Sequence, residues 1–117
     1  MTSNQAVSSI IIDCKSQEHL DEIIATHSKV IVLFYSYAMP WGKIGEHKMH
    51  VCARELEKGH ITTIPFVLVN YGEFYVQGKR ISIVPTVMIR YTAYVDGREH
   101  QSTGNSAELE GLVTALL

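Results

Sequence analysis

The feature that most constrains the fold of this chain is the unbroken apolar run Val-Ile-Val-Leu-Phe at residues 30–34. A short run of this kind, rich in β-branched residues and followed by Pro40 and Gly42, predicts a buried strand that leads into a loop. A strand that is apolar on both faces needs covering elements above and below it, because both sets of its side chains must leave water. The chain is therefore expected to form a sheet that is covered on both faces.

Strand-like and helix-like patterns alternate along the rest of the chain. The β-branched triplet at residues 10–12 suits a first buried strand, whereas Leu20, Ile23 and Ile24 recur at the spacing of one helix face. Strands are predicted over residues 6–13, 30–36, 62–70, 86–92 and 94–103. Helices are predicted over residues 17–27, between the Pro40-Trp41-Gly42 turn and Gly59, over 73–77, and after Ser106. This order joins crossover units to a terminal hairpin and predicts an α/β fold with a mixed sheet flanked by helices.

Local signals indicate where these elements begin and end. Ser16 and Ser106 are expected to cap the helices that follow them, and Gly59 is expected to end the second helix in a left-handed conformation. Pro65 should lie near the start of its strand, because proline cannot donate to a strand ladder. The dipeptide Asp96-Gly97 predicts the turn between the last two strands.

Length and composition indicate one domain spanning residues 1–117, with residues 1–5 as a disordered tail. The chain has 117 residues, 46% of them hydrophobic, which is ample for one buried core. Its formal charge of -2 gives no basic field for nucleic acid or an acidic membrane, so we expect a protein or small-molecule partner. No apolar stretch approaches the length of a membrane span and no signal-peptide pattern opens the chain, so a cytoplasmic protein is expected.

The only two cysteines, Cys14 and Cys52, lie far apart in the sequence and show no Cys-x-x-Cys spacing. The spacing encodes neither a disulfide framework nor a local dithiol pair, and we expect both thiols to be reduced and structural. Cys52 shares helical spacing with Met49, Ala53 and Leu56, so it is expected on the packed face of its helix.

The order of elements and two short motifs resemble the thioredoxin-like superfamily. The buried run leads into Tyr-Ser-Tyr-Ala-Met-Pro-Trp-Gly-Lys at residues 35–43, and Ile83-Val84-Pro85-Thr86 is similar to the family's apolar-Pro-Thr motif. The resemblance covers nearly the whole chain. It implies a thioredoxin-like fold and a cis peptide bond before Pro85, with an ordinary trans proline as the alternative.

The residues that carry thioredoxin chemistry are absent from the matching positions. Aligned on Phe34 and Lys43, residues 39–42 (Met-Pro-Trp-Gly) stand where the family has Cys-Gly-Pro-Cys; shifted by one residue, Ala38 and Trp41 stand at the two cysteines. Thiol-disulfide exchange needs an attacking thiolate and a second, resolving thiol, and neither register provides one. Leu33 stands where the resemblance implies a buried acid. We therefore expect that the chain is not an enzyme.

The resemblance places a protein-binding face around the former active-site loop. Exposed aromatic and methionine side chains are typical of interface hot spots, and the backbone beside a cis proline can bind an extended peptide. Two residues of this face have an alternative interpretation: Trp41 could fill the core, and Gly104 could be an ordinary loop glycine. The predicted partner-binding residues are Tyr37, Met39, Pro40, Trp41, Val84, Pro85 and Gly104.

A second cluster, Glu46, His47 and His50, has the helical spacing that a transition-metal site can use. A solvated helix face is the favoured interpretation because no further ligand converges on it, so we expect neither a metal nor a cofactor. The basic residues of the same region alternate with glutamates, which also favours a solvated face.

Three functional hypotheses follow. The first is a redox-inactive protein-binding or adaptor module that uses the face around the former active-site loop. The second is a glutathione- or thiol-binding enzyme that uses the same groove, although it lacks an evident nucleophile. The third is a structural homodimer that pairs through its aromatic loop or a strand edge.

Overall fold

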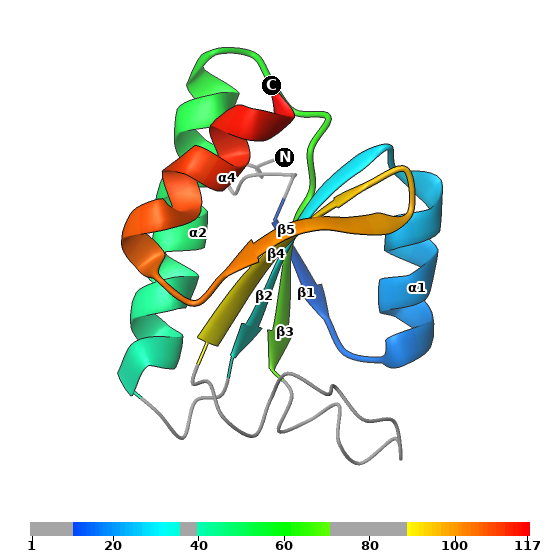
Figure 1. Cartoon of the computed structure of the whole chain (residues 1–117), viewed down its shortest axis with the longest axis horizontal. Coiled ribbons are helices and arrows are strands. Elements are labelled where there is room, and N and C mark those ends of the chain that lie inside the picture. The colour runs from blue at the N-terminus through cyan, green and yellow to red at the C-terminus, as the bar shows by residue number, and fades with distance from the viewer. Residues whose placement is uncertain (1–10, 36–39, 71–88) are drawn as a thin grey trace, which may run out of the picture.

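The computed structural model describes residues 11–35, 40–70 and 89–117, with only the backbone described for Pro40 and Trp41. The described residues form a five-stranded sheet with helices on both faces, as Figure 1 shows. The strands are β1 (Ile11–Cys14), β2 (Lys29–Tyr35), β3 (Phe66–Asn70), β4 (Ile89–Val95) and β5 (Arg98–Thr103). The helices are α1 (Gln17–Thr26), α2 (Pro40–Lys58) and α4 (Leu109–Leu116), the last preceded by the 3-10 turn η3 (Ser106–Glu108).

The strands lie in the order β1-β3-β2-β4-β5. β1, β3 and β2 are parallel, whereas β4 and β5 are antiparallel additions beside β2. The apolar run at residues 30–34 lies inside β2, the central strand, and each of its side chains is 5% exposed or less. The predicted α/β fold with a mixed sheet flanked by helices is confirmed.

Alternate side chains of β2 enter two separate hydrophobic cores. Ile31, Leu33 and Tyr35 face α2 and α4, together with residues such as Phe66, in what we call the α2/α4 core. Val30, Val32 and Phe34 lie in the other cluster, together with Leu20 and Ile23 of α1, in what we call the α1 core. The period of two in a strand makes this division unavoidable once both faces are covered.

Helix α1 forms where it was predicted and ends one residue earlier. The hydroxyl of Ser16 accepts a hydrogen bond from the backbone N–H of His19 at 3.1 Å, which confirms the predicted cap. Leu20 and Ile23 are buried against the sheet, while Ile24 is only half-buried. The apolar face of α1 is therefore narrow and covers the side of the sheet that contains β1 and β3.

Helix α2 differs from the prediction at both ends. It begins at Pro40, so the Pro-Trp-Gly segment is its first turn rather than a turn before it; proline is well tolerated there because the first N–H groups of a helix have no partner inside it. At the other end His60, not Gly59, has the left-handed backbone, with φ of 66°. The N–H groups of His60 and Ile61 donate to the carbonyls of Glu57 and Leu56, which closes the helix in a Schellman motif with His60 at the left-handed position.

Several strand boundaries also differ, most of all at β3 and at the hairpin of β4 and β5. β3 begins at Phe66 and not at residue 62, immediately after Pro65, which confirms that this proline lies at the start of the strand. The hairpin turns at Asp96 and Gly97 as predicted, with φ of 53° and 83°, the left-handed pair of a type I′ turn. Tyr94 and Val95 belong to β4, however, so β5 starts at Arg98.

The last helix is not capped by Ser106. The side chain of Asn105 accepts a hydrogen bond from Ala107 N–H at 2.9 Å and caps η3, from which α4 continues. Ser106 instead uses its hydroxyl in a 2.7 Å hydrogen bond with the hydroxyl of Tyr91. At the far end of α4, the Lys29 ammonium of β2 donates to the carbonyl of Leu116, so the helix is held to the sheet at both ends.

Several predictions fall outside the described residues. They are the tail at residues 1–5, the start of the first strand at 6–10, the helix at 73–77 and the strand start at 86–88. Across the described ranges, none of the helices has the length and apolar character needed to cross a membrane.

Candidate functional site

One edge of the sheet brings together the ends of the described segments around the predicted site. The carboxyl ends of β2 and β3 point to the same side of the molecule (Figure 1), and Tyr35 pairs with both Asn70 and Ile89. Residues 36–39 follow Tyr35, and residues 71–88 connect Asn70 to Ile89. We call this the site edge. The carboxyl ends of parallel strands are where open α/β sheets commonly bind ligands.

The structure describes three of the seven predicted partner-binding residues. Pro40 and Trp41 form the first turn of α2, for which only the backbone is described. Gly104 lies between β5 and η3. The other four lie outside the described residues, as does the peptide bond before Pro85, whose cis form stays a prediction: Tyr37, Met39, Val84 and Pro85.

Gly104 lies at the site edge but needs no glycine-specific backbone. It is exposed, its φ is outside the left-handed region, and a Cβ placed on it would lie 3.5 Å from the carbonyl oxygen of Ile89. That distance is an ordinary van der Waals contact. An alanine therefore fits at this position, and a functional reason for glycine there has to come from a partner that approaches the backbone closely.

A compact hydrogen-bonded corner holds Gly104 in place. The Thr103 hydroxyl donates to the Glu108 carboxylate at 2.5 Å and accepts from the N–H of Asn105 at 3.1 Å. The Asn105 carbonyl in turn accepts from the N–H of Glu108 at 2.9 Å. These bonds, with the Asn105 cap, bridge both sides of Gly104. The corner is thus ordered by local contacts before any partner binds.

A buried pair of hydroxyl groups joins this corner to the core. Tyr91 of β4 is fully buried and its hydroxyl is hydrogen-bonded to Ser106. Burial raises the pKa of the Tyr91 hydroxyl, and the bond with Ser106 partly opposes that shift. A Cβ on Gly45 of α2 would lie 3.2 Å from the Tyr91 hydroxyl and 3.3 Å from a methyl of Leu33. Gly45 therefore allows α2 to pack closely over this pair.

The two cysteines lie in different cores. Cys52 is 7% exposed in the α2/α4 core, as its helical spacing predicted, and Cys14 is 1% exposed in the α1 core on the other face of the sheet. Both thiols are free. Burial raises the pKa of each thiol, with Glu110 adding to the effect at Cys52 and a backbone interaction with Ser16 opposing it at Cys14. A raised pKa disfavours the thiolate, which is the reactive form.

The position that the resemblance gives to a buried acid is occupied by an apolar side chain in the α2/α4 core. Leu33 is fully buried there, opposite Leu68 of β3 and Tyr91 of β4. Among the described residues of this core, the side chains that can ionise are those of Tyr35, Cys52 and Tyr91. At neutral pH these groups are neutral in a buried environment, so this part of the core offers no carboxylate to move a proton.

The Glu46, His47 and His50 cluster does not converge into a ligand set. His47 is exposed and His50 is half-buried on α2. Within the part of the chain that the structure describes, no group of three or more histidine, cysteine, aspartate or glutamate side chains is placed to hold a metal ion.

Sequence reasoning missed the residues that organise the corner. It assigned Ser106 to a cap, although Asn105 is also a good cap residue and directly precedes it. It gave Gly45 of α2 no role of its own in packing. A glycine within a helix costs stability, and this cost was the available signal that a close approach occurs at that position.

Comparisons with known proteins identify the architecture. No model of a known protein family matches the chain, and no curated protein matches its sequence. Solved structures do match. Thioredoxin from Plasmodium falciparum aligns with a TM-score of 0.75 at 20% identity, over 91% of this chain and 99% of its own.

Two further solved structures agree with this match. Mitochondrial thioredoxin 3 of Saccharomyces cerevisiae, in its oxidised form, gives a TM-score of 0.72 at 16% identity, over 90% of this chain and 94% of its own. Fasciola hepatica thioredoxin gives 0.71 at 16% identity, over 89% and 97%. Identities this low show the fold and nothing beyond it. The chain has the thioredoxin fold, as the resemblance implied.

Proposed function

We propose that this thioredoxin-fold chain is a redox-inactive protein-binding or adaptor module. Its docking face is formed by the segment that follows β2, the start of α2, the Val84-Pro85 segment and Gly104. The partner is a protein, and no cofactor takes part. The observation that carries the proposal is the position of the only two cysteines, which are buried in separate cores on opposite faces of the sheet.

The placement of the cysteines supports the absence of dithiol chemistry. A dithiol reductase needs two sulfur atoms close enough to form a bond of about 2 Å, with one of them accessible as a thiolate. Cys14 and Cys52 have the sheet between them, and burial raises the pKa of both thiols. Neither cysteine lies at the site edge, where the resemblance puts Met39 and Gly42, or in the shifted register Ala38 and Trp41, at the positions of the family's thiols.

The corner around Gly104 supports a docking role for the site edge. Its hydrogen bonds involve Thr103, Asn105 and Glu108 and leave Gly104 exposed. A preorganised surface binds a partner at a lower entropy cost than one that must be ordered on binding. An accessible glycine backbone is suited to an extended peptide segment, and the aromatic and methionine residues of the sequence that follows β2 are of the types enriched at interfaces.

We also propose a cytoplasmic location. Both thiols are free, which is typical of proteins in reducing compartments. Labelling of intact cells with a fluorescent fusion tests this, and accumulation of the fusion in an oxidising compartment would contradict it.

An insulin-reduction assay tests the absence of redox activity. The purified chain is assayed with dithiothreitol beside an active thioredoxin, together with the variants Cys14→Ser and Cys52→Ser. The expected rate is that of dithiothreitol alone for all three forms. Turnover that exceeds this background and is lost in either serine variant would show that a cysteine becomes accessible, and the proposal would fail.

Affinity capture tests the docking face. The wild type and Trp41→Ala are immobilised and compared for the proteins they retain, with Lys58→Ala as a matched control because Lys58 is an exposed residue at the far end of α2. We expect Trp41→Ala to lose a partner that wild type and Lys58→Ala both retain. Equal retention by all three would show that the face lies elsewhere.

A further inference from the structure

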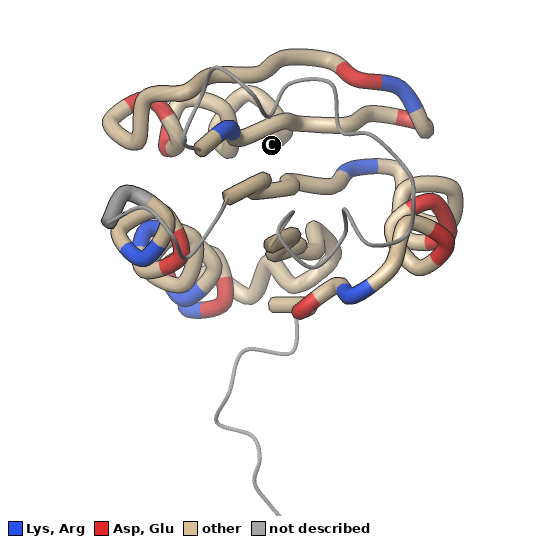
Figure 2. The backbone as a smooth tube through the Cα atoms, turned by 90° about the horizontal axis from the view of Figure 1, so that it is seen from below, with Lys and Arg blue, Asp and Glu red and all other residues tan. Residues whose placement is uncertain are grey.

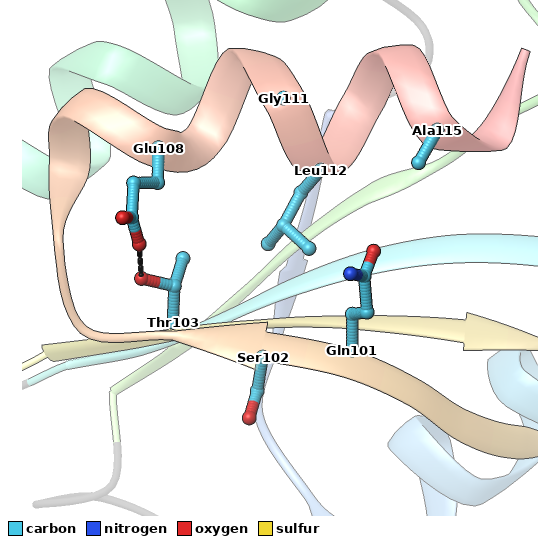
Figure 3. A pocket seen from close by; sticks show the side chains of 7 residues that line it. All are labelled: Gln101, Ser102, Thr103, Glu108, Gly111, Leu112 and Ala115. Atoms are coloured by element: carbon cyan, nitrogen blue, oxygen red, sulfur yellow. Dashed lines mark hydrogen bonds between the residues drawn. The ribbon is translucent and has the colours of Figure 1, made fainter.

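A groove separates the edge strand β5 from helix α4, away from the cysteines. Its volume is about 410 Å³, and Figure 3 shows the side chains around it. Gln101 and Thr103 point from β5 toward α4, whereas Ser102 points to the other face of the sheet (Figure 3). The full lining is Gln101, Ser102, Thr103, Glu108, Gly111, Leu112 and Ala115.

Small residues on α4 keep this groove open. A Cβ placed on Gly111 would meet no atom within 4 Å, and Ala115, one helical turn further on, offers only a methyl group. Leu112 points toward the strand between them and is 6% exposed, so it forms an apolar floor. The groove thus has an apolar middle section, with the Glu108 carboxylate at one end and the Gln101 amide nearer the other (Figure 3).

The neighbouring edge of the sheet is open to a further strand. β5 pairs with β4 on one side, and no other strand of the described residues pairs with it. A register irregularity between Ala93 and Tyr94 leaves His100 as an extra residue in β5, so the regular part of the strand is Gln101, Ser102 and Thr103. The backbone groups on the outer edge of a terminal strand are those that pair with an added peptide strand.

Among the residues that line the groove, the only charged one is Glu108, whereas the basic side chains of Arg90 and Lys29 already donate hydrogen bonds to Ser102 and to the Leu116 carbonyl. After Arg98 the sequence contains Glu99, Glu108 and Glu110 and no lysine or arginine. Beyond Arg98, which begins β5, the charged positions that follow in β5, η3 and α4 are acidic, as the red segments in Figure 2 indicate. Glu108 accepts one hydrogen bond from Thr103, and a carboxylate can accept about four, so it retains capacity for a cation.

We propose that the outer edge of β5 binds an extended peptide segment of a partner protein and that a lysine or arginine side chain of this segment lies in the groove. The aliphatic stem of the basic side chain packs over Leu112 and Gly111, and its charged head reaches the Glu108 carboxylate. Lysine and arginine match this arrangement because they combine an apolar stem with a cationic end. The site lies along β5 and α4 and shares Thr103 and Glu108 with the corner that holds Gly104, but it takes a different segment of the partner from the one at the site edge.

The first test uses short blocked peptides as probes with isotope-labelled protein. The probe is acetyl-Thr-Val-Lys-Val-Thr-amide, and the controls replace its lysine with norleucine or glutamate. Nuclear magnetic resonance spectra should show that the lysine peptide shifts the backbone amide signals of residues 101–103 and 111–115. We expect the norleucine peptide to bind about three- to fivefold more weakly, the usual scale of one exposed ion pair, and the glutamate peptide more weakly still.

Three protein variants separate the contribution of the groove from that of the charge. Gly111→Leu fills the groove and should reduce binding at least tenfold, whereas Thr114→Leu, at an exposed position that does not line the groove, should leave it unchanged. Glu108→Gln keeps the size and the acceptor for Thr103, and should make the lysine and norleucine peptides bind equally. Circular dichroism melting curves check that all variants are folded. Gly111→Leu is expected to fold because a Cβ placed at that position meets no atom within 4 Å.

Three outcomes would overturn the proposal. The first is equal binding of the lysine, norleucine and glutamate peptides to the wild type. The second is binding that Gly111→Leu leaves unchanged. The third is a concentration-dependent increase in mass in sedimentation experiments without peptide that is abolished by Gly111→Leu, since the occupant of the groove would then be a second copy of this chain.

Discussion

The α2/α4 core and the α1 core pack against opposite faces of the same strands, but they are built differently. The α2/α4 core contains the buried hydroxyl of Tyr91, which is hydrogen-bonded to Ser106 next to the Gly104 corner. The described side chains of the α1 core are apolar apart from Cys14 and the half-buried Tyr94 beside them. A change in the first core can therefore alter the site edge, whereas a change in the second is expected to alter stability alone.

The largest expected effect comes from placing a carboxylate in each core. Leu33→Asp and Val32→Asp both bury a charge, and each should lower the free energy of unfolding by at least about 3 kcal/mol, a large part of the stability of a typical domain. Leu33→Asp should be the less damaging, because its carboxylate lies near the Tyr91 hydroxyl. Urea denaturation measures both, and a smaller loss for Val32→Asp would contradict the contrast between the cores.

Removing one hydroxyl group on each side of the sheet tests the difference between the two cores with a smaller perturbation. Tyr91→Phe breaks the bond to Ser106 and should cost about 1 kcal/mol, whereas Tyr94→Phe, whose hydroxyl makes no hydrogen bond within the described part of the chain, should be nearly neutral at pH 7. A double-mutant cycle of Tyr91→Phe with Ser106→Ala, followed by urea denaturation, isolates the bond. Additive effects in that cycle would mean that the two hydroxyls do not interact.

Two helix caps offer a matched pair on the two sides of the sheet. Asn105→Ala and Ser16→Ala each remove one side-chain acceptor of a backbone N–H and should cost about 1 kcal/mol in thermal or urea unfolding. Only Asn105→Ala loosens the corner that carries Gly104. Only this variant should therefore also weaken capture of the partner whose retention depends on Trp41. If Ser16→Ala weakens capture equally, the corner is not the binding element.

The alkaline pH dependence of stability should come in part from the α1 side. Burial, with the charges of Glu99 and Asp21, raises the pKa of Tyr94 to about 12, above the ordinary tyrosine value of about 10. Between these values the folded chain keeps a proton that the unfolded chain releases, so stability falls as pH rises from 10 to 12. Tyr94→Phe should flatten this fall in urea midpoints, and an unchanged slope would exclude Tyr94 as a source.

The smallest effect on stability is expected at the site edge itself. Gly104→Ala introduces a methyl group at ordinary contact distance from the Ile89 carbonyl in an allowed backbone conformation, so unfolding should change by a few tenths of a kcal/mol. If the partner approaches this backbone closely, the same methyl group should reduce its capture. Unchanged stability together with unchanged capture would remove Gly104 from the docking face.

Much of the fold was predictable because burial leaves a periodic record in the sequence. The run at residues 30–34, the helical spacing of Leu20 and Ile23, and the Asp96-Gly97 turn each identified the correct element. The boundaries were less accurate where local signals compete. Gly59 and His60 both border the end of α2, and the hydrogen bonds of the closing turn, rather than glycine's wider conformational range, placed His60 in the left-handed position.

The candidate site was predictable only in outline. The sequence showed that the segment that follows β2 contains no thiol, because residue types alone determine which chemistry is available; its role as a docking segment stays a prediction. It did not indicate the corner formed by Thr103, Asn105 and Glu108 or the groove beside Gly111. Those features depend on the packing of α4 over β5 and on which polar groups meet there, and no local pattern records such contacts.

The sequence by itself indicated the main strands and helices that the structure describes, though not all of their boundaries, and that the two cysteines are not spaced as a redox motif. Only the tertiary structure decided that these cysteines lie on opposite faces of the sheet, that Tyr91 meets Ser106, and that α4 leaves β5 partly uncovered. The physical reason is the separation along the chain of the residues that determine each feature. Secondary structure follows from side-chain periodicity over a few residues, whereas neighbours across the sheet are set by how distant segments share one volume.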